Sequence, residues 1–244
     1  MWSKPLKGWS EAEQLANGYN AQNILEKVLS SARLVKSGAA IYERDSVIFN
    51  KIQHDWPLLA ILQKIAIENG NSIVLVDFGG SLGSSYFQNR SWLTNVHIKW
   101  VVVEQPHFVE IGKKEFETNE LKFEFLLEDA FKYKPHVVLL SSVLQYLENP
   151  NEIIAAIASS GVEHIIVDRT SIAQPINQNV VTLQTVPEDL YKASYPCWFF
   201  EEEGLKNGFL SNYHLETEFA SYCDMPLVQD DITYLWKGYY FKKK

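Results

Sequence analysis

Glycines and a carboxylate stand together in one short segment, residues 77–83, which read DFGGSLG. Asp77 ends an apolar run of strand length, and a helical pattern follows over residues 84–90. Glycine lets the backbone turn sharply and lets a ligand approach where a Cβ atom would collide. The N-terminus of the helix beyond the turn offers free backbone N–H groups. The segment therefore predicts a ligand-binding loop, with a purely structural turn as the alternative.

The register of the glycines separates the classes of ligand that such a loop could hold. A dinucleotide fingerprint reads G-x-G-x-x-G, whereas this loop reads G-G-S-L-G, with one glycine out of register. The phosphate-binding pattern G-x-x-x-x-G-K-[ST] does not occur in the sequence. The loop therefore disfavours a nicotinamide dinucleotide and a P-loop nucleotide site.

Two further acids follow at the ends of the next predicted strands. Glu104 ends the second strand, where a carboxylate can accept hydrogen bonds from both hydroxyl groups of a ribose. Asp129 follows the third strand and could accept from the exocyclic amine of an adenine, with Ala130 or Phe131 against the ring. Taken alone, each acid is better explained as a solvated strand end. The three features in this order favour a ligand that contains a nucleoside.

Short apolar strands alternate with helical segments after residue 70. The strands are predicted at residues 73–77, 100–104, 123–127, 137–141 and 165–168. The helices between them are predicted at residues 84–90, 108–118 and 151–159. Continuous apolar strands that alternate with helices indicate a parallel sheet covered on both faces. Residues 213–221 and 233–241 alternate as antiparallel strands do, and they predict a terminal hairpin.

The residues before this region have a helical period. Apolar side chains recur at helical spacing from about residue 20 to residue 69, and Gly38 marks the end of a first helix. A second helix is predicted to open near Asp45 and to restart after Asp55, which can cap it, with Pro57 in its first turn.

The length of 244 residues suits one α/β domain with an extension. We expect an N-terminal helical cap or lid over residues 1–69 and a core over residues 70–244. Residues 2–8 could form either a docked arm or a loose tail.

The order of these motifs resembles the class I S-adenosylmethionine-dependent methyltransferases. The resemblance covers about residues 70–170 and includes the segment SSVLQYL at residues 141–147. The loop departs from the usual acid-x-G-x-G-x-G pattern because Ser81 and Leu82 follow a pair of glycines. More narrowly, the segments YERDS, WPLL and YPCWFF resemble a bacterial group of methyltransferases often encoded near surface-polysaccharide genes.

This resemblance implies an α/β fold, a doubly wound, seven-stranded and mostly parallel sheet of the Rossmann-like methyltransferase type. We expect the strand order 3-2-1-4-5-7-6 with strand 7 antiparallel, and N-terminal helices folded over the crevice at the carboxyl ends of the strands. Carried over residue by residue, the expected contacts to S-adenosyl-L-methionine come from Asp77, Gly79, Gly80, Ser81, Gly83, Glu104, Gln105, Asp129, Ala130, Ser141 and Ser142. Tyr42 and Arg44 are the candidates for contacts to the cofactor from the N-terminal lid.

Methyl transfer requires little of the protein beyond alignment of an acceptor and exclusion of water, although an oxygen acceptor usually also needs a base. Asp168 could be that base, and Arg169 could clamp an anionic substrate. A salt-linked strand end is the alternative for this pair. The expected substrate-binding residues are Gln145, Tyr146, Tyr195 and Trp198.

Composition argues against several other partners. The formal net charge is -8, with 22 basic residues against 30 acidic ones, whereas a nucleic-acid surface needs a dense basic stripe. The six histidines show no metal-ligand spacing, so no metal is expected. Two cysteines are too few for a disulfide framework, and no apolar leader or membrane-length run occurs. We expect a cytoplasmic protein with no membrane span.

The function we expect is S-adenosylmethionine-dependent methyl transfer to a small-molecule or saccharide acceptor, on oxygen. A non-catalytic module that binds the same cofactor is one alternative, and in such a module Asp168, Arg169 and Trp198 would be dispensable. A nicotinamide-dependent oxidoreductase is another, which the glycine register disfavours. The sequence defines neither the acceptor nor an oligomeric state.

Overall fold

The computed structural model describes residues 2–16, 21–186, 193–222 and 225–244. Its contacts divide the chain into two compact units. We call one the central unit, with residues Leu25–Ser141 and Val162–Ile166. The other is the terminal unit, with residues Met1–Ile24, Ser142–Gly161 and Val167–Lys244. Each unit is described by itself.

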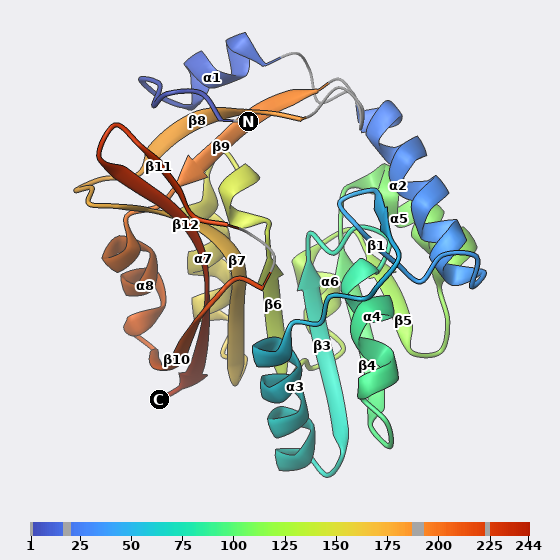
Figure 1. Ribbon diagram of the computed structural model, residues 1–244. Coiled ribbons are helices and arrows are strands. Elements are labelled where there is room, and N and C mark those ends of the chain that lie inside the picture. The colour runs from blue at the N-terminus through green and yellow to red at the C-terminus, as the bar shows by residue number, and fades with distance from the viewer. Residues whose placement is uncertain (1, 17–20, 187–192, 223–224) are drawn as a thin grey trace. The chain divides into compact units, whose positions relative to one another are not determined.

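Parallel strands form the core of the central unit (Figure 1). The strands are β3 (Ser72–Phe78), β4 (His97–Val103), β5 (Leu121–Glu124) and β6 (Val137–Ser141). β3 pairs with both β4 and β6, and β5 pairs with β4 at the edge. The first four residues of β6 are fully buried, as in a strand covered on both faces.

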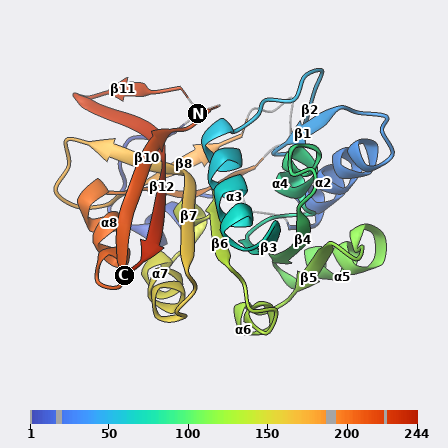
Figure 2. The same ribbon diagram turned by 90° about the horizontal axis from the view of Figure 1, so that it is seen from below.

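Helices cover this sheet on both sides. They are α3 (Trp56–Glu68), α4 (Ser84–Asn89), α5 (Pro106–Ile111) and α6 (Leu127–Phe131), and a π-helical turn, η2 (Gly112–Phe116), extends α5. α2 (Ala21–Lys36) contacts η2, where Arg33 Nη2 pairs with Glu115 Oε1 at 2.6 Å. Figure 2 shows α3 and α6 on opposite sides of β3. The sheet and its helices therefore form the doubly wound arrangement that the sequence predicts.

The segment before α3 differs from the prediction. A helix was expected to open near Asp45, but residues Tyr42–Arg44 and Val47–Phe49 form an antiparallel hairpin, β1 and β2. Asp45 and Ser46 have φ values of 51° and 70°. Positive φ at both central residues is typical of the tight two-residue turn that joins paired strands. The turn chemistry at these two positions therefore outweighs the helical spacing of the apolar residues.

The terminal unit contains the rest of the sheet. β7 (His164–Gln174) begins in the central unit and ends in the terminal one, and it is followed in the sheet by β12 (Ile232–Lys243) and β10 (Tyr213–Ala220). β12 runs antiparallel to β10 and to the short β11 (Leu227–Gln229). The helices of this unit are α1 (Trp9–Leu15), α7 (Pro150–Ser159) and α8 (Glu202–Leu210).

The sheet of the described residues has eight strands instead of the predicted seven, because the short β11 also pairs with β12. The other seven strands follow the order β10-β12-β7-β6-β3-β4-β5. It is the predicted order 3-2-1-4-5-7-6 read from the other edge, with the last strand reversed against its hairpin partner. The fold class is therefore confirmed.

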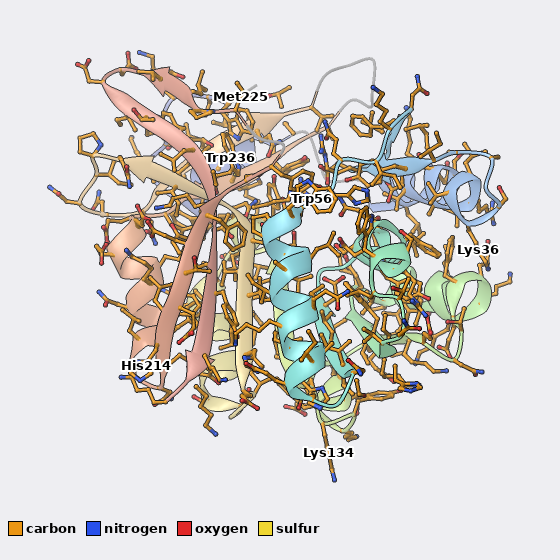
Figure 3. The ribbon with its side chains drawn as sticks, turned by 60° about the horizontal axis from the view of Figure 1, so that its bottom comes forward. Lys36, Trp56, Lys134, His214, Met225 and Trp236 are labelled. Carbon is orange, nitrogen blue, oxygen red and sulfur yellow. The ribbon has the colours of Figure 1, made fainter. Side chains whose placement is uncertain are left out.

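One hairpin of the terminal unit was not predicted. β8 (Val180–Thr185) pairs with β9 (Ser194–Phe199), and the N-terminal residues add to the free edge of β8. Ser3 N donates to Leu183 O at 2.9 Å, and Leu6 N donates to Val181 O at 2.8 Å. Residues 2–8 are thus a docked arm. Trp2 packs against Trp236, the β12 residue labelled in Figure 3, at a ring distance of 5.2 Å.

No helix among the described residues is long and apolar enough to cross a lipid bilayer.

The predicted cap of α3 is confirmed and can be tested by substitution. Asp55 Oδ1 accepts from Leu58 N at 2.9 Å, and the Asp55 side chain is buried. Loss of an N-cap costs about 0.5–2 kcal/mol, whereas asparagine caps as well as aspartate. Asp55→Ala should therefore lower the midpoint of thermal unfolding by several degrees, about 2–4 °C per kcal/mol. Asp55→Asn is the control and should lose less than half as much; equal losses in both variants would contradict the capping role.

Candidate functional site

The glycine loop has the strand–turn–helix geometry that the sequence predicts. After β3 ends, Gly79 N donates to Val103 O at 2.9 Å, which holds the start of the loop against β4. The backbone then reverses at Gly79, Ser81 and Gly83, with φ values of 76°, 55° and 90°. α4 begins at Ser84, directly after Gly83. The loop therefore lies at the carboxyl end of β3, where ligands bind in sheets of this kind.

The carboxylate of Asp77 is packed beneath this loop. Asp77 is 1% exposed, and its Oδ2 accepts from Trp100 Nε1 at 2.9 Å. A Cβ atom added to Gly80 would lie 2.6 Å from Asp77 Cγ and Oδ2. Because no Cβ tolerates such a distance, the loop can approach Asp77 only with glycine at position 80.

Glu104 connects the loop to the end of β4. Its Oε1 accepts from Ser81 N at 3.2 Å, and its Oε2 accepts from Gln105 N at 2.7 Å. Burial raises the pKa of the Glu104 carboxyl, and the hydrogen bonds from Gln105 and Ser81 oppose that rise. An ionised carboxylate has about four lone-pair positions, so two acceptor positions remain for donors from a ligand.

The third acid is placed differently from the prediction. β5 ends at Glu124, earlier than the expected residue 127, and α6 begins at Leu127. Asp129 therefore lies in the first turn of α6, where its Oδ1 pairs with Lys132 Nζ at 2.6 Å. Ala130 is fully buried in the same turn. Contacts from Asp129 and Ala130 to an adenine stay predictions.

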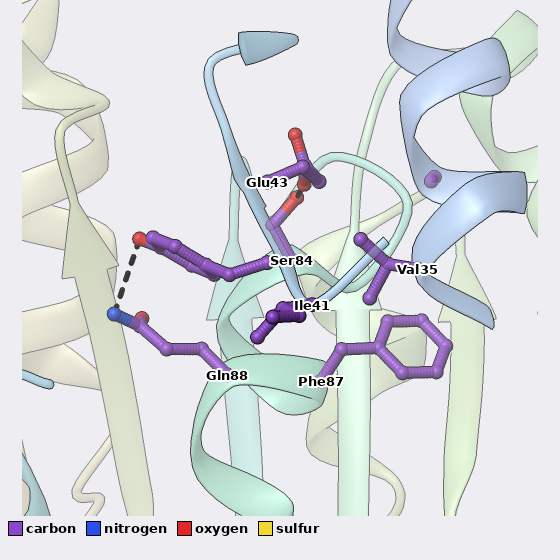
Figure 4. A pocket seen from close by; sticks show the side chains of 8 residues that line it. Val35, Ile41, Glu43, Ser84, Phe87 and Gln88 are labelled. Atoms are coloured by element: carbon purple, nitrogen blue, oxygen red, sulfur yellow. Dashed lines mark hydrogen bonds between the residues drawn. The ribbon is translucent and has the colours of Figure 1, made fainter. Parts of the chain in front are cut away.

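The β1–β2 hairpin supplies a residue that the sequence reasoning missed. Glu43 is 4% exposed, and its carboxylate accepts from the hydroxyl of Ser84 at the start of α4 and from Ser46 N at 3.3 Å. Figure 4 shows Glu43 and Ser84 side by side. Glu43 thus fixes the hairpin to the helix that follows the glycine loop. The sequence predicts a helix that opens near Asp45, and that prediction gave Glu43 no role.

Tyr42 and Arg44, the residues predicted to reach the cofactor from this segment, have partners inside the central unit. Tyr42 is buried, and its hydroxyl accepts from Gln88 Nε2 at 3.1 Å. Arg44 donates from Nη1 to Gln53 Oε1 at 2.5 Å and lies over the ring of Phe49. Their contacts to a cofactor stay predictions.

A small cavity lies beside Tyr42, between α2, β1 and α4 (Figure 4). Its volume is about 10 Å³, which is no more than one water molecule requires. It therefore belongs to the packing of the hairpin and is not a ligand site. The residues that line it are Ala32, Val35, Ile41, Tyr42, Glu43, Ser84, Phe87 and Gln88.

The predicted catalytic pair lies within a strand of the terminal unit. β7 continues past Asp168 to Gln174, so the expected strand end at residue 168 is wrong. The continuation pairs with the segment after β9, through Ala173 N to Phe200 O at 3.1 Å. Asp168 is 1% exposed, and Arg169 has a φ of 50° inside the strand. A left-handed residue at such a place is uncommon outside glycine and is found at sites under functional constraint.

Hydrogen bonds join this pair to the segment after β6. Ser142 N donates to Asp168 O at 2.9 Å. Gln145 is fully buried, and its Nε2 donates to Ser142 Oγ and to Arg169 O, both at 3.1 Å. The structure thus brings together four predicted residues from two separate segments. Gln145 holds Ser142 and Arg169 in place, and a substrate contact from its side chain stays a prediction.

The predicted aromatic residues form a second group of the terminal unit. Tyr146 lies in the 3-10 turn η3 (Leu144–Tyr146), with its hydroxyl donating to Gln184 Oε1 at 2.9 Å and its ring edge-on to Tyr195 at 5.3 Å. Trp198 donates from Nε1 to Leu147 O at 3.1 Å. The ring of Trp9 in α1 stacks on Trp198 at 5.7 Å, so α1 covers one face of that side chain.

The two sets of predicted residues belong to different units. The cofactor set, apart from Ser142, lies in the central unit, and the catalytic and substrate set lies in the terminal unit. β7, which passes from one unit to the other, carries Asp168 and Arg169 just after that change.

Comparison with known proteins identifies the fold. No protein-family model matches the sequence, and no curated protein matches it. Among solved structures, the glycopeptide N-methyltransferase MtfA with S-adenosyl-L-homocysteine matches 76% of this chain and 90% of its own at 8% identity, with a TM-score of 0.50. The amino pentose methyltransferase CalS10 of Micromonospora echinaspora matches 80% of this chain and 92% of its own, at 10% identity and a TM-score of 0.48.

A third structure covers nearly the whole chain. The 1,6-didemethyltoxoflavin-N1-methyltransferase of Burkholderia thailandensis matches 99% of this chain and 93% of its own, at 13% identity and a TM-score of 0.45. The match to MtfA covers 76% of this chain, and the strand order described above is the one expected of the methyltransferase fold. The chain therefore has the Rossmann-like α/β fold of the class I methyltransferases.

The close approach of the loop to Asp77 predicts the effect of a methyl group at position 80. Gly80→Ala must displace either the buried Asp77 carboxylate or the loop, and overpacking of this kind costs about 1–3 kcal/mol. Thermal unfolding should show a clear loss of stability. Gly8→Ala is the control, since nothing lies within 4 Å of its added Cβ and its φ of 171° is extended backbone. It should change stability by about 0.5 kcal/mol or less. Equal stability of Gly80→Ala and the wild type would contradict the packing described.

Proposed function

We propose that this chain is an S-adenosylmethionine-dependent methyltransferase that acts on a hydroxyl group of a small-molecule or saccharide acceptor. One observation carries the proposal: Glu104, at the end of β4, hydrogen-bonds through Oε1 to Ser81 N in the glycine loop after β3. This contact places a carboxylate suited to ribose hydroxyls directly beside a loop whose backbone can approach a ligand closely. We further propose a cytoplasmic location and no nucleic-acid substrate.

The residues present fit the proposed cofactor. Glu104 keeps acceptor capacity after its two backbone hydrogen bonds, as two ribose hydroxyls require. The loop over residues 79–83 packs against Asp77 because Gly80 has no side chain, and its backbone would lie along the amino-acid part of the cofactor. When bound, S-adenosylmethionine would supply a methyl group that is already activated for transfer.

We assign binding and activation of the acceptor to residues of the terminal unit. Asp168 would take the proton from the acceptor hydroxyl as the oxygen attacks the methyl carbon and the carbon–sulfur bond breaks. Arg169 would hold an anionic group of the acceptor. Its left-handed backbone within β7 supports a functional constraint at this position. Tyr146, Tyr195 and Trp198 would provide apolar surface against a sugar ring or a similar small molecule.

Cofactor affinity should depend on the charge of Glu104. Burial raises the pKa of its carboxyl above the ordinary value of 4.5, and ribose hydroxyls would donate to the ionised form. Binding therefore favours deprotonation, so affinity should be constant at neutral pH and should fall as the pH drops through the raised pKa. Isothermal titration calorimetry with S-adenosylhomocysteine should give a low-micromolar Kd at neutral pH, about -8 kcal/mol, and a weaker one under acidic conditions.

Substitution of the carboxylate gives the matched comparison. Glu104→Gln should weaken cofactor binding about tenfold or more, because hydrogen bonds to a charged acceptor contribute about 1.5–3 kcal/mol. The affinity of this variant should also no longer decrease as the pH is lowered, because glutamine does not titrate. Glu110→Gln, an exposed carboxylate on α5, is the control and should leave both unchanged. The proposal fails if neither S-adenosylmethionine nor its demethylated product gives saturable heat.

The role of Asp168 separates an enzyme from a module that only binds the cofactor. Asp168→Asn preserves the shape of a buried side chain, so the affinity for S-adenosylhomocysteine and the thermal midpoint should stay close to the wild-type values. A positioned base contributes about 10²–10⁴-fold, so turnover should fall by about 100-fold or more. The measurement is release of S-adenosylhomocysteine from S-adenosylmethionine across a panel of monosaccharides and small hydroxy acids. Wild-type turnover that the substitution leaves unchanged would exclude Asp168 as the base.

A further inference from the structure

Three metal-ligating side chains meet at the end of the central unit opposite to the glycine loop. His164 is the first residue of β7, Glu163 precedes it, and Glu68 is the last residue of α3. The ligand atoms of these three residues all lie within 4.8 Å of one another. No sequence spacing predicts the group, because Glu68 is distant in the chain from the other two.

The distances suit one cation between the three side chains. His164 Nε2 lies 3.6 Å from Glu163 Oε1 and 3.8 Å from Glu68 Oε2. Both values exceed the length of a hydrogen bond. Zinc bonds of about 2.0–2.2 Å to nitrogen and oxygen, at tetrahedral angles, separate neighbouring ligand atoms by about 3.4 Å. Small rotations of the two glutamates would bring the three atoms to that spacing.

The three side chains differ in burial, and the two glutamates can be reached by an ion from solvent. The His164 side chain is fully buried, so its ring is held in one orientation by the surrounding core. The side chains of Glu68 and Glu163 are 37% and 52% exposed, so a cation can reach them from water. Lys64 adds a positive charge at the site: its Nζ pairs with Glu68 Oε1 at 2.6 Å, and Glu68 Oε2 lies 3.8 Å from His164 Nε2.

We propose that Glu68, Glu163 and His164 form a binding site for a divalent transition-metal ion of the zinc type. One imidazole and two carboxylates are a donor set that zinc accepts, with water in the fourth position. β3, which starts shortly after Glu68, has 7 residues, so the glycine loop at its far end lies about 20 Å away. The ion therefore takes no part in methyl transfer and instead ties the end of α3 to the start of β7.

The test uses the full chain without a polyhistidine tag and zinc chloride as the probe. Isothermal titration calorimetry at neutral pH should give one zinc ion per chain. Zinc at 100-fold above its Kd should raise the thermal midpoint by about 5 °C or more. Glu163→Gln and Glu68→Gln change exposed side chains, so both proteins should fold; each should weaken zinc binding at least tenfold and lose the thermal shift. His164→Gln should do the same.

Two controls match the donor types. His214→Gln removes an exposed imidazole on β10 (Figure 3), and Glu110→Gln removes an exposed carboxylate on α5. Both variants should bind zinc as the wild type does. The proposal is overturned if zinc binds only weakly at several sites, or if Glu163→Gln and Glu68→Gln retain wild-type affinity. Either result would mean that Glu68, Glu163 and His164 lie close together without holding a metal ion.

Discussion

The packing of the Asp77 carboxylate beneath Gly80 is the constraint on which the rest of the central unit depends. The carboxylate is held by the indole of Trp100, which fixes it relative to β4. Because the loop can then pass close above it, Ser81 N reaches Glu104 at the end of the same strand. One buried acid thus sets the position of the loop and of the second acid. Glu43 adds a further restraint by holding the start of α4.

The residues that we propose for cofactor binding and for methyl transfer lie in different segments of the chain. The loop and the two acids that would hold the cofactor belong to the central unit, whereas the base and the aromatic surface proposed for the acceptor belong to the terminal unit. β7 passes from one to the other, and the left-handed backbone of Arg169 falls just after that change. A different acceptor could therefore be accommodated by changes after residue 141 while the cofactor loop stays the same.

The sequence predicted the elements that depend on neighbouring residues or on a regular spacing of apolar side chains. The continuous apolar run of β6 was predicted to the residue, and the capping chemistry of Asp55 located the start of α3. The β1–β2 hairpin was missed because its apolar residues also fit a helix, and only the turn at residues 45–46 distinguishes the two. β7 was cut short at Asp168 because Thr170 and Ser171 interrupt its apolar run although both are buried. Partners distant in the chain, such as Glu43 with Ser84, leave no periodic signal.

We propose that the glycine loop and Glu104 together bind S-adenosylmethionine. A crystal structure of the chain with S-adenosylhomocysteine tests it most directly. We predict the ribose hydroxyls within hydrogen-bond distance of the Glu104 carboxylate and the amino-acid part of the ligand along residues 79–83. A ligand bound elsewhere, or a loop that carries no ligand when the compound is in saturating excess, would contradict the account.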